Sequence, residues 1–166
     1  MVEVSTPLPA PSADVWRRAV TPEGINDELR PVLRMTMPKR LRGRTIDDVP
    51  TGETLGRSWI LLGGVLPVDY DDLRLVELEP GRRFQERSSM ATLRLWTHER
   101  IVEPDGTGAC IVTDRLGWEP RALLARIPGS DRLVARIVGA LFRHRHRRLA
   151  RYWGLSPAAR KASSSS

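Results

Sequence analysis

The sequence has only one cysteine, Cys110, and aromatic residues make up only 5% of its 166 residues. One cysteine excludes an intramolecular disulfide and a zinc site built from several thiolates. A reducing compartment suits such a chain, and we expect a cytoplasmic protein. Long apolar runs are also missing, because the longest mostly apolar stretch, residues 59–68, contains two glycines and a proline. We therefore expect neither a membrane span nor, at the N-terminus, a secretory signal.

Lysine is nearly absent, since 25 of the 27 basic residues are arginine. The net charge of +7 is unevenly placed: residues 1–114 contain 15 basic and 18 acidic residues, whereas residues 115–166 contain 12 and 2. A basic C-terminal third is typical of binding to nucleic acid, an anionic membrane surface or an acidic protein, and also of a merely solvated face. No nucleic-acid recognition motif accompanies it, so we expect no nucleic-acid partner.

The length of 166 residues corresponds to one domain. A chain of this size buries about 70% of the surface of its unfolded form, so a core can form without disulfides or structural metals. We expect one domain over residues 1–154. The remaining residues, 155–166, end in four serines and are predicted to be a disordered tail.

Hydrophobic spacing changes along the chain. Alternation predicts a first strand over residues 2–8, and helical spacing then predicts two short helices over residues 12–20 and 22–29. Alternation returns in six further segments separated by turn residues: 32–37, 55–62, 68–78, 82–90, 93–102 and 110–118. The short connections predict an antiparallel meander and exclude a parallel doubly wound sheet.

A long amphipathic helix is predicted near the C-terminus, where apolar residues recur every three or four positions from Leu133 to Tyr152. Ser130 is expected to cap it, and Asp131 suits its positive end. The second half of this helix is crowded with arginines. These side chains form a solvated face or contact an anionic membrane: Arg143, Arg145, Arg147, Arg148 and Arg151.

Several motifs resemble those of a known superfamily. Residues 8–16, LPAPSADVW, are similar to the opening of the SRPBCC superfamily, the START-like and polyketide-cyclase-like ligand-binding proteins. Four later segments resemble motifs of its uncharacterised bacterial branch, in the same order: LGGVLP at 62–67, EPGRRF at 79–84, WTH at 96–98 and TDRLGWEP at 113–120. One position departs from the pattern, because Arg100 stands where the family often has a second histidine. The resemblance covers residues 2–153.

This resemblance implies an α+β, helix-grip fold. A curved antiparallel sheet of about seven strands would wrap around the long C-terminal helix, with two short helices after the first strand. The resemblance also implies a hydrophobic cavity between sheet and helix for a lipid-like, sterol-like or polyketide-like molecule. We expect neither a cofactor nor a metal ion.

The residues expected to line this cavity are aromatic and apolar side chains of the strands and the last helix, together with two polar residues. About half of the aromatic residues are expected only to fill the core. The predicted ligand contacts are Trp59, Tyr70, Phe84, Trp96, His98, Asp114, Trp118, Leu133, Ile137 and Leu141.

Three polar residues are candidates for chemistry. His98 and Arg100 share one face of a strand, and Asp114 would need one of them as a partner if it is buried. A three-residue loop at 105–107 pairs residue 98 with residue 114 on one face, whereas a two-residue loop places them on opposite faces. The sequence leaves both arrangements open.

These observations support two hypotheses of different class. The leading one is a noncatalytic protein that carries or sequesters a hydrophobic small molecule. The alternative is a cyclase-like or aromatase-like enzyme in which His98, Arg100 or Asp114 assists proton transfer. His144 and His146 are two residues apart on a helix and so face apart, which argues against a metal site.

Overall fold

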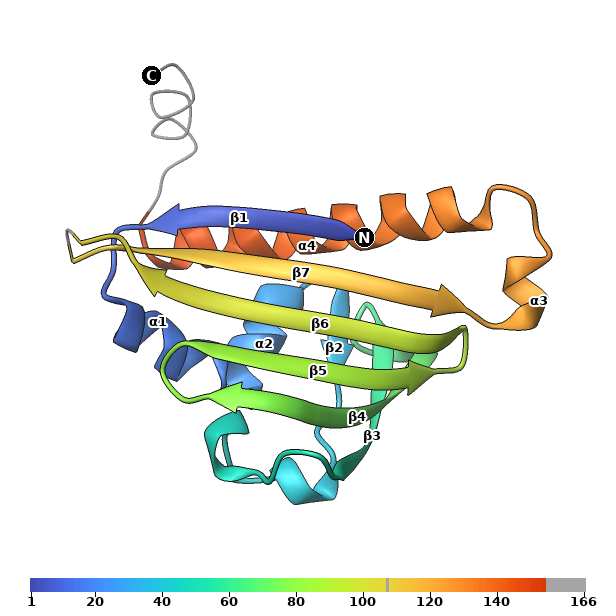
Figure 1. Ribbon diagram of the computed structural model, residues 1–166, viewed down its shortest axis with the longest axis horizontal. Coiled ribbons are helices and arrows are strands. Elements are labelled where there is room, and N and C mark those ends of the chain that lie inside the picture. The colour runs from blue at the N-terminus through green and yellow to red at the C-terminus, as the bar shows by residue number, and fades with distance from the viewer. Residues whose placement is uncertain (107, 155–166) are drawn as a thin grey trace, which may run out of the picture.

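The computed structural model describes residues 1–106 and 108–154, so the predicted disordered tail lies outside the described residues. Seven strands form one antiparallel sheet in the order β1-β7-β6-β5-β4-β3-β2. The strands are β1 (Val2–Leu8), β2 (Leu33–Met35), β3 (Thr54–Leu62), β4 (Leu66–Glu79), β5 (Arg83–Met90), β6 (Leu93–Pro104) and β7 (Cys110–Pro120). The sheet curls, and its concave side faces the helices (Figure 1). The predicted meander is therefore confirmed.

The helices are α1 (Ser12–Ala19), α2 (Pro22–Leu29), the short 3-10 helices η1 (Lys39–Leu41) and η2 (Ile46–Asp48), α3 (Ala122–Ala125) and α4 (Ser130–Tyr152). The long α4 runs beside β1 and across the back of the sheet, while α1 and α2 lie below the C-terminal half of α4 (Figure 1). This arrangement is the predicted helix-grip fold. No helix in the two described ranges is long and apolar enough to cross a membrane.

The junction between α1 and α2 explains how closely these helices meet. The Thr21 hydroxyl accepts a hydrogen bond from the Gly24 N–H at 3.0 Å, which caps α2, and Pro22 occupies its first turn. A Cβ atom at Gly24 would lie 2.0 Å from the Arg18 carbonyl oxygen. Only glycine therefore permits this approach.

The N-terminus of α4 differs from the prediction. Ser130 is the first helical residue rather than the cap, and Gly129 precedes it with a φ of +80° and no side-chain cap. Glycine adopts this left-handed conformation without the steric cost of a Cβ atom. The backbone geometry at Gly129, rather than a serine hydroxyl, thus starts the helix.

The β6–β7 hairpin has a longer loop than either predicted alternative. Pro104 pairs with Cys110, and the Asp105 N–H donates to the Ala109 carbonyl at 3.2 Å. In this register Arg100 lies opposite Asp114, and His98 lies opposite Leu116. The predicted three-residue loop would have paired residue 98 with residue 114, so the observed partner on β7 lies two positions further along the chain. Because side chains alternate with period two, the side chains of residues 98 and 114 still share the concave face.

Two hydrophobic clusters occupy opposite ends of the concave side. The α1-side cluster includes Val15, Trp16, Phe84, Val112 and Leu149. The α3-side cluster consists of Met90, Leu93, Trp96, Leu116, Val138 and Phe142, with Ile60, Trp118, Leu124, Val134 and Leu141 among the partly buried residues packed against it. On β5, β6 and β7 the residues between the two clusters are polar, and these form the candidate site.

Candidate functional site

Ten buried polar side chains cross the concave face between the two hydrophobic clusters. The sheet supplies seven of them and the helices three, and each is at most 9% exposed. We call this set the buried polar row: Ser58, Asp71, Glu86, Ser88, His98, Arg100 and Asp114 from β3 to β7, Glu28 from α2, and Arg145 and His146 from α4. Charged groups are rarely buried this deeply unless they are paired.

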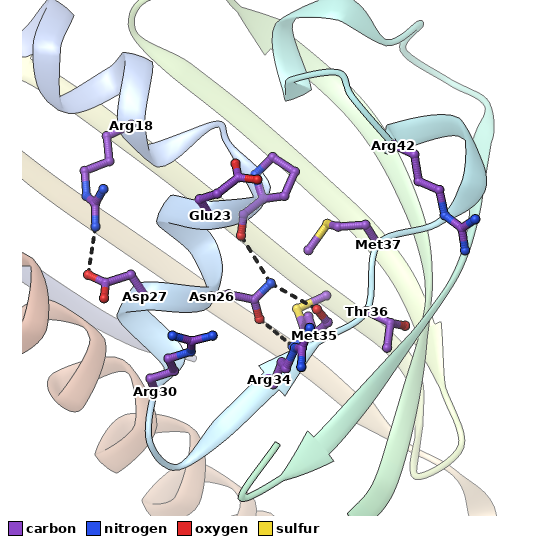
Figure 2. A pocket seen from close by; sticks show the side chains of 11 residues that line it. Arg18, Glu23, Asn26, Asp27, Arg30, Arg34, Met35, Thr36, Met37 and Arg42 are labelled. Carbon is purple, nitrogen blue, oxygen red and sulfur yellow. Dashed lines mark hydrogen bonds and ion pairs between the residues drawn. The ribbon is translucent and has the colours of Figure 1, made fainter. Parts of the chain in front are cut away.

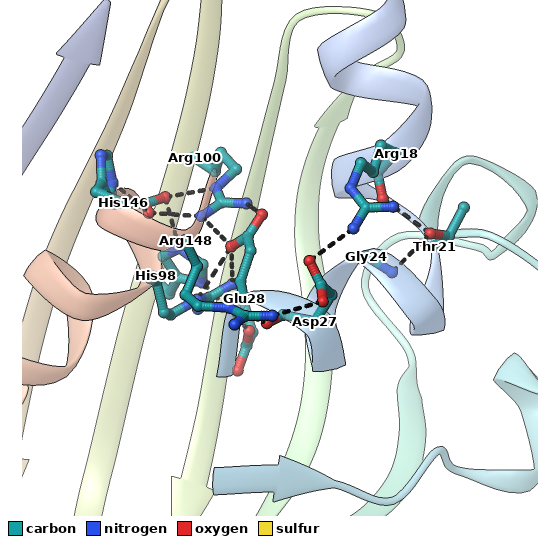
Figure 3. A network of polar contacts seen from close by, with 12 residues as sticks. Arg18, Thr21, Gly24, Asp27, Glu28, His98, Arg100, His146 and Arg148 are labelled. Atoms are coloured by element: carbon teal, nitrogen blue, oxygen red, sulfur yellow. Dashed lines mark hydrogen bonds and ion pairs between the residues drawn. The ribbon is translucent and has the colours of Figure 1, made fainter. Parts of the chain in front are cut away.

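Arg100 is the centre of the row. Its Nε and Nη2 atoms donate to the two carboxylate oxygens of Asp114 at 2.8 and 2.7 Å. Its Nη1 and Nη2 atoms donate to the two oxygens of Glu28, both at 2.9 Å. Figure 3 shows Arg100 and Glu28 joined in this way. Two bidentate contacts use the planar guanidinium fork on both sides and tie α2 to the sheet.

Asp114 is fully buried and accepts hydrogen bonds from three side chains. Besides Arg100, His98 Nε2 lies 3.0 Å from its Oδ1 and His146 Nε2 lies 2.9 Å from its Oδ2. Burial by itself raises the pKa of this carboxyl, but the charge and hydrogen bonds of Arg100, with those of the histidines, outweigh burial and hold the pKa well below its usual range. Asp114 is therefore ionised in the folded protein.

Two side chains of α4 complete the centre of the row. Arg145 Nη2 donates to Glu28 Oε2 at 2.9 Å, and the Arg145 guanidinium lies 4.7 Å from the centre of the Phe142 ring. His146 Nδ1 lies 2.8 Å from Thr6 Oγ1 on β1. Burial opposes ionisation of Glu28, but the charges of Arg100 and Arg145 lower its pKa below the usual value. The centre of the row thus joins α2, α4 and three strands.

Toward β5 the row continues from His98 to Glu86. His98 Nδ1 lies 3.8 Å from Glu86 Oε2, and the Ser88 hydroxyl donates to Glu86 Oε1 at 2.8 Å. Burial lowers the pKa of His98, but the charge and hydrogen bond of Asp114 and the bond to Glu86 outweigh it, so the pKa is raised. Burial and then the Glu86 carboxylate raise the pKa of Asp71 well above its usual value. The pKa of Glu86 is lowered, so Asp71 is the carboxyl of this pair that holds a proton more readily.

The β3–β4 end of the row has unused hydrogen-bonding capacity. Among the residues that the structure describes, Ser58 Oγ and Asp71 Oδ1 are buried without a partner, as is Trp153 Nε1 at the end of α4. Ser58 and Asp71 lie opposite each other in the sheet. Buried polar atoms are usually paired with protein or water, so an orphan pair at one place favours a polar group bound between them.

Trp59 and Tyr70, two of the predicted ligand contacts, lie on the convex face. They are register partners next to Ser58 and Asp71, and alternation turns them to the opposite side. Their rings contact at 6.0 Å, and the Arg57 guanidinium lies 3.9 Å from the centre of the Tyr70 ring. These two aromatic residues therefore lie on the convex surface, apart from the other predicted contacts.

The other predicted aromatic contacts lie within or beside the clusters. Phe84 belongs to the α1-side cluster, with its ring 5.4 Å from His98. Trp96 and Trp118 are register partners; Trp96 is buried near Phe142, and Trp118 Nε1 donates to Asp131 at 2.8 Å.

The three predicted contacts on α4 differ in burial. Leu141 is half-buried against the α3-side cluster, whereas Leu133 and Ile137 are 57% and 59% exposed. The four-residue spacing places all three in one line along the helix. The N-terminal half of α4 therefore carries a line of apolar side chains that the rest of the protein buries only in part.

The sequence analysis predicted three members of the row, His98, Arg100 and Asp114, as site residues. It missed the other seven: Ser58, Asp71, Glu86, Ser88, Glu28, Arg145 and His146. The spacing argument about the two α4 histidines holds, because His144 bonds to the Arg30 carbonyl while His146 faces Asp114. The sequence analysis applied this spacing only to a metal site, and it did not foresee the contact of His146 with Asp114. Within the described ranges, no three His, Cys, Asp or Glu side chains are grouped to hold a metal ion.

The predicted basic face of α4 needs a correction. Arg145 is buried against Glu28, and Arg148 donates to the Asp27 carboxylate at 2.8 Å, so neither guanidinium is free at the surface. The Glu28 and Asp27 carboxylates of α2 hold these two side chains by ion pairs. The exposed arginines among those predicted are Arg143, Arg147 and Arg151, spaced four residues apart along one side of the helix.

A separate cleft of about 610 Å³ lies outside the row, between α2 and the chain that follows β2 (Figure 2). It shares no residue with the predicted ligand contacts. Its lining is Arg18, Pro22, Glu23, Asn26, Asp27, Arg30, Arg34, Met35, Thr36, Met37 and Arg42. Four guanidinium groups and two carboxylates thus meet around one concavity.

Solved structures with the same fold are numerous. The chain is similar to protein CV1439 from Chromobacterium violaceum, with 17% identity and a TM-score of 0.67 over 92% of this chain and 95% of that one. A START superfamily protein from Mycobacterium smegmatis has 11% identity and a TM-score of 0.64, covering 92% and 95%. DynU16, from the dynemicin biosynthetic locus, has 21% identity and a TM-score of 0.60, and the match covers 91% of this chain but 46% of DynU16.

These likenesses show the fold, which is that of the START-like SRPBCC proteins. No curated protein is significantly similar in sequence. Residues 6–153 match a family described as a domain of unknown function, DUF8410. The match spans nearly all of the described chain, and the protein therefore belongs to the DUF8410 family.

Proposed function

We propose that the protein binds an apolar small molecule of lipid-like, sterol-like or polyketide-like character and acts as a carrier or sequestering protein in the cytoplasm. The observation that carries this proposal is a set of uncovered apolar side chains at one end of a fold shared with START-like proteins. The apolar rim consists of Val32, Leu62, Leu66, Leu133 and Ile137, which are 42%, 45%, 57%, 57% and 59% exposed.

The apolar rim is assembled from three parts of the fold. Leu62 pairs with Leu33 at the start of β2 and with Leu66 across the β3–β4 hairpin. His144 Nε2 lies 2.8 Å from the Arg30 carbonyl, which holds the chain entering β2 close to α4. The β3–β4 hairpin and the N-terminal half of α4 lie at the same end of the molecule (Figure 1). An apolar molecule held there would remove rim side chains from water.

A ligand at this end would extend toward the α3-side cluster and the orphan atoms of the buried polar row. Ile60 packs against that cluster and lies two residues from Ser58 on the same strand, while Asp71 pairs with Met90 of the cluster. A single polar group on the ligand would meet Ser58 Oγ and Asp71 Oδ1 there. This division into an apolar body and one polar contact is common in small-molecule sites.

The centre of the buried polar row favours binding over catalysis. All three nitrogens of the Arg100 guanidinium donate to carboxylates, and both oxygens of Asp114 accept from protein side chains. Four of the five N–H groups of Arg100 are used in this way, and groups so committed stabilise the fold and leave little hydrogen-bonding capacity for a substrate. The cyclase-like alternative predicts instead that His98 exchanges a proton with a substrate.

The proposal is tested by native mass spectrometry of the protein as purified from cells, followed by organic extraction and identification of what is released. We expect a stoichiometric apolar companion. A fluorescent fatty acid then measures affinity for the wild type, Ile137→Ser and the control Ile111→Ser, which changes an exposed isoleucine on the convex face of β7.

Ile137→Ser should weaken binding about tenfold, because burial of such a side chain is worth roughly 1.5–3 kcal/mol. Ile111→Ser should leave affinity unchanged. An empty protein, together with probe binding that both substitutions leave unaltered, would refute the proposed site.

A further inference from the structure

The cleft between α2 and the chain after β2 is separate from the apolar rim and the buried polar row. On α2, Asn26 lies about 160° around the helix axis from Glu28, which points to Arg100, and Arg30 follows the end of the helix. Two sides of one short helix therefore face two different environments. The proposal made here is independent of the ligand at the apolar rim.

The walls of the cleft are held in place by Asn26. Its Nδ2 donates to the Met35 carbonyl at 3.0 Å and to the Pro22 carbonyl at 3.1 Å, and its Oδ1 accepts from the Met35 N–H at 2.8 Å. Met35 in turn pairs with Ile60 of the sheet. Figure 2 shows this amide bridging α2 and β2. The concavity is thus a preformed feature of the backbone.

The charges around the cleft are unbalanced. Asp27 is already committed, because Arg18 and Arg148 each donate to its carboxylate at 2.8 Å. Arg30, Arg34 and Arg42 make no ion pair with an acid among the residues the structure describes. Glu23 remains as the one uncommitted carboxylate. Three uncompensated guanidinium groups around a fixed concavity favour an anion.

The remaining lining defines the kind of anion. Guanidinium groups bind phosphate oxygens in a planar, bidentate manner, and the neighbouring Arg30 and Arg34 (Figure 2) match a doubly charged phosphate monoester better than a singly charged carboxylate. Pro22, Met35 and Met37 add apolar surface, and methionine adapts to irregular shapes. A volume of about 610 Å³ is far larger than a phosphate ion and is typical of small-molecule sites.

We propose that this cleft binds an organic phosphate monoester, with the phosphate on Arg30 and Arg34 and the organic part against Met35 and Met37. In Figure 2, Arg30 and Arg34 lie together at one end of the cleft, Arg42 lies apart from them on the wall across from α2, and Glu23 lies away from Arg30 and Arg34. The phosphate group could belong to a free metabolite or to a phospholipid head group.

Calorimetry with phenyl phosphate and inorganic phosphate tests the free form, and vesicles of phosphatidylcholine with or without phosphatidic acid test the lipid form. We compare the wild type with Arg30→Gln/Arg34→Gln and with the control Arg74→Gln/Arg87→Gln, which removes the same charge from exposed positions on β4 and β5. Thermal melting confirms that each variant is folded.

We expect phenyl phosphate to bind at least tenfold more tightly than inorganic phosphate, and Arg30→Gln/Arg34→Gln to weaken it at least tenfold while the control changes it less than twofold. Glu23→Gln should tighten binding about threefold, since it removes a repulsive charge. Binding restricted to phosphatidic acid vesicles, with the same ranking of variants, would assign the site to a lipid head group.

Three results overturn the proposal. One is equal weakening by both double variants, which would mean only general charge attraction. Another is phenyl phosphate binding no more tightly than inorganic phosphate. The last is no binding of phenyl phosphate or phosphatidic acid vesicles at millimolar concentration.

Discussion

Arg100 and Asp114 lie directly opposite each other on β6 and β7 and share two hydrogen bonds of 2.8 and 2.7 Å in a site from which water is excluded. The same guanidinium holds Glu28 of α2, so one side chain joins the sheet to the helix. Removing two such charges from water costs several kcal/mol per ion, and only complete pairing offsets that cost. The buried polar row therefore holds α2 against the sheet, and each of its buried charges depends on the others for compensation.

Arg100→Met should lower the free energy of unfolding by about 3–5 kcal/mol, because two buried carboxylates lose their main cation. Arg100→Lys should lose about half as much, since an ammonium group keeps the charge but cannot span both carboxylates. Urea denaturation at pH 7 measures both. Arg87→Met, at an exposed position of β5, is the control and should change stability by less than about 0.5 kcal/mol. A loss under 1 kcal/mol for Arg100→Met would contradict this account.

The pH dependence of stability should carry a contribution from His98. Its pKa is raised above the ordinary 6.5 in the folded protein, so its stabilising effect is complete below pH 6.5 and is lost as the pH rises through the folded pKa. His98→Gln should therefore flatten the fall in unfolding free energy above neutral pH. Denaturation between pH 6 and pH 9 tests this, with His144→Gln as the control. Parallel curves for the wild type and His98→Gln would exclude the effect.

The sequence predicted the fold because that prediction needs only periodicity and turn residues. Alternation with period two predicted the strands, and the spacing of residues 133–152 predicted α4. It also predicted that Asp114 would need His98 or Arg100 as a partner if buried, and the structure makes both contacts. The choice of loop was beyond the sequence, because two-residue and three-residue turns fit the same glycine-rich stretch.

Other features of the site depend on tertiary contacts that no local pattern encodes. Glu28 lies on a short helix with polar neighbours. Nothing in its position in the sequence distinguishes it from Glu23, which is exposed, or from Asp27, which is half-buried. Trp59 and Tyr70 were predicted as ligand contacts because they are aromatic residues on predicted strands, whereas the face of the sheet on which they lie depends on the register around Ser58 and Asp71. Burial of a charge is decided by the partner that another element brings.

The arginines of α4 should separate into two groups on substitution. Arg145→Gln should lower the free energy of unfolding by about 2–3 kcal/mol, because Glu28 loses a buried charged donor. Arg147→Gln, about half a turn away and exposed, should leave stability unchanged. Thermal and urea denaturation of the two variants measure the difference, and equal effects would show that Arg145 is not fastened to Glu28.

The predicted contact with an anionic membrane now involves Arg143, Arg147 and Arg151. Each basic residue near such a surface contributes about 1 kcal/mol at low salt, so Arg147→Gln/Arg151→Gln should weaken binding to phosphatidylserine vesicles at least tenfold. Co-sedimentation at low and high salt measures this. Binding that is equal for phosphatidylcholine vesicles, or unchanged in the double variant, would leave these arginines as a solvated face.

Asp71→Asn should stabilise the protein at neutral pH. Burial and the Glu86 carboxylate raise the pKa of Asp71 in the folded state, whereas the unfolded chain ionises near pH 3.8. The stabilising effect of the protonated carboxyl is thus complete below about pH 3.8 and is lost as the pH rises through the pKa of the folded state. Each pKa unit of this difference costs about 1.4 kcal/mol, and asparagine removes the cost while keeping the shape.

We expect a gain of about 1–2 kcal/mol for Asp71→Asn at pH 7 that shrinks toward zero at pH 4, measured by urea denaturation at both values. Asp72→Asn is the matched control, because Asp72 faces the convex side and is paired with Arg57, whose hydrogen bonds lower its pKa. That substitution should give no gain at pH 7. A loss of stability for Asp71→Asn that is the same at pH 4 and pH 7 would show instead that Asp71 is ionised and bound to a cationic donor, and the polar end of the proposed ligand would then have to carry positive charge.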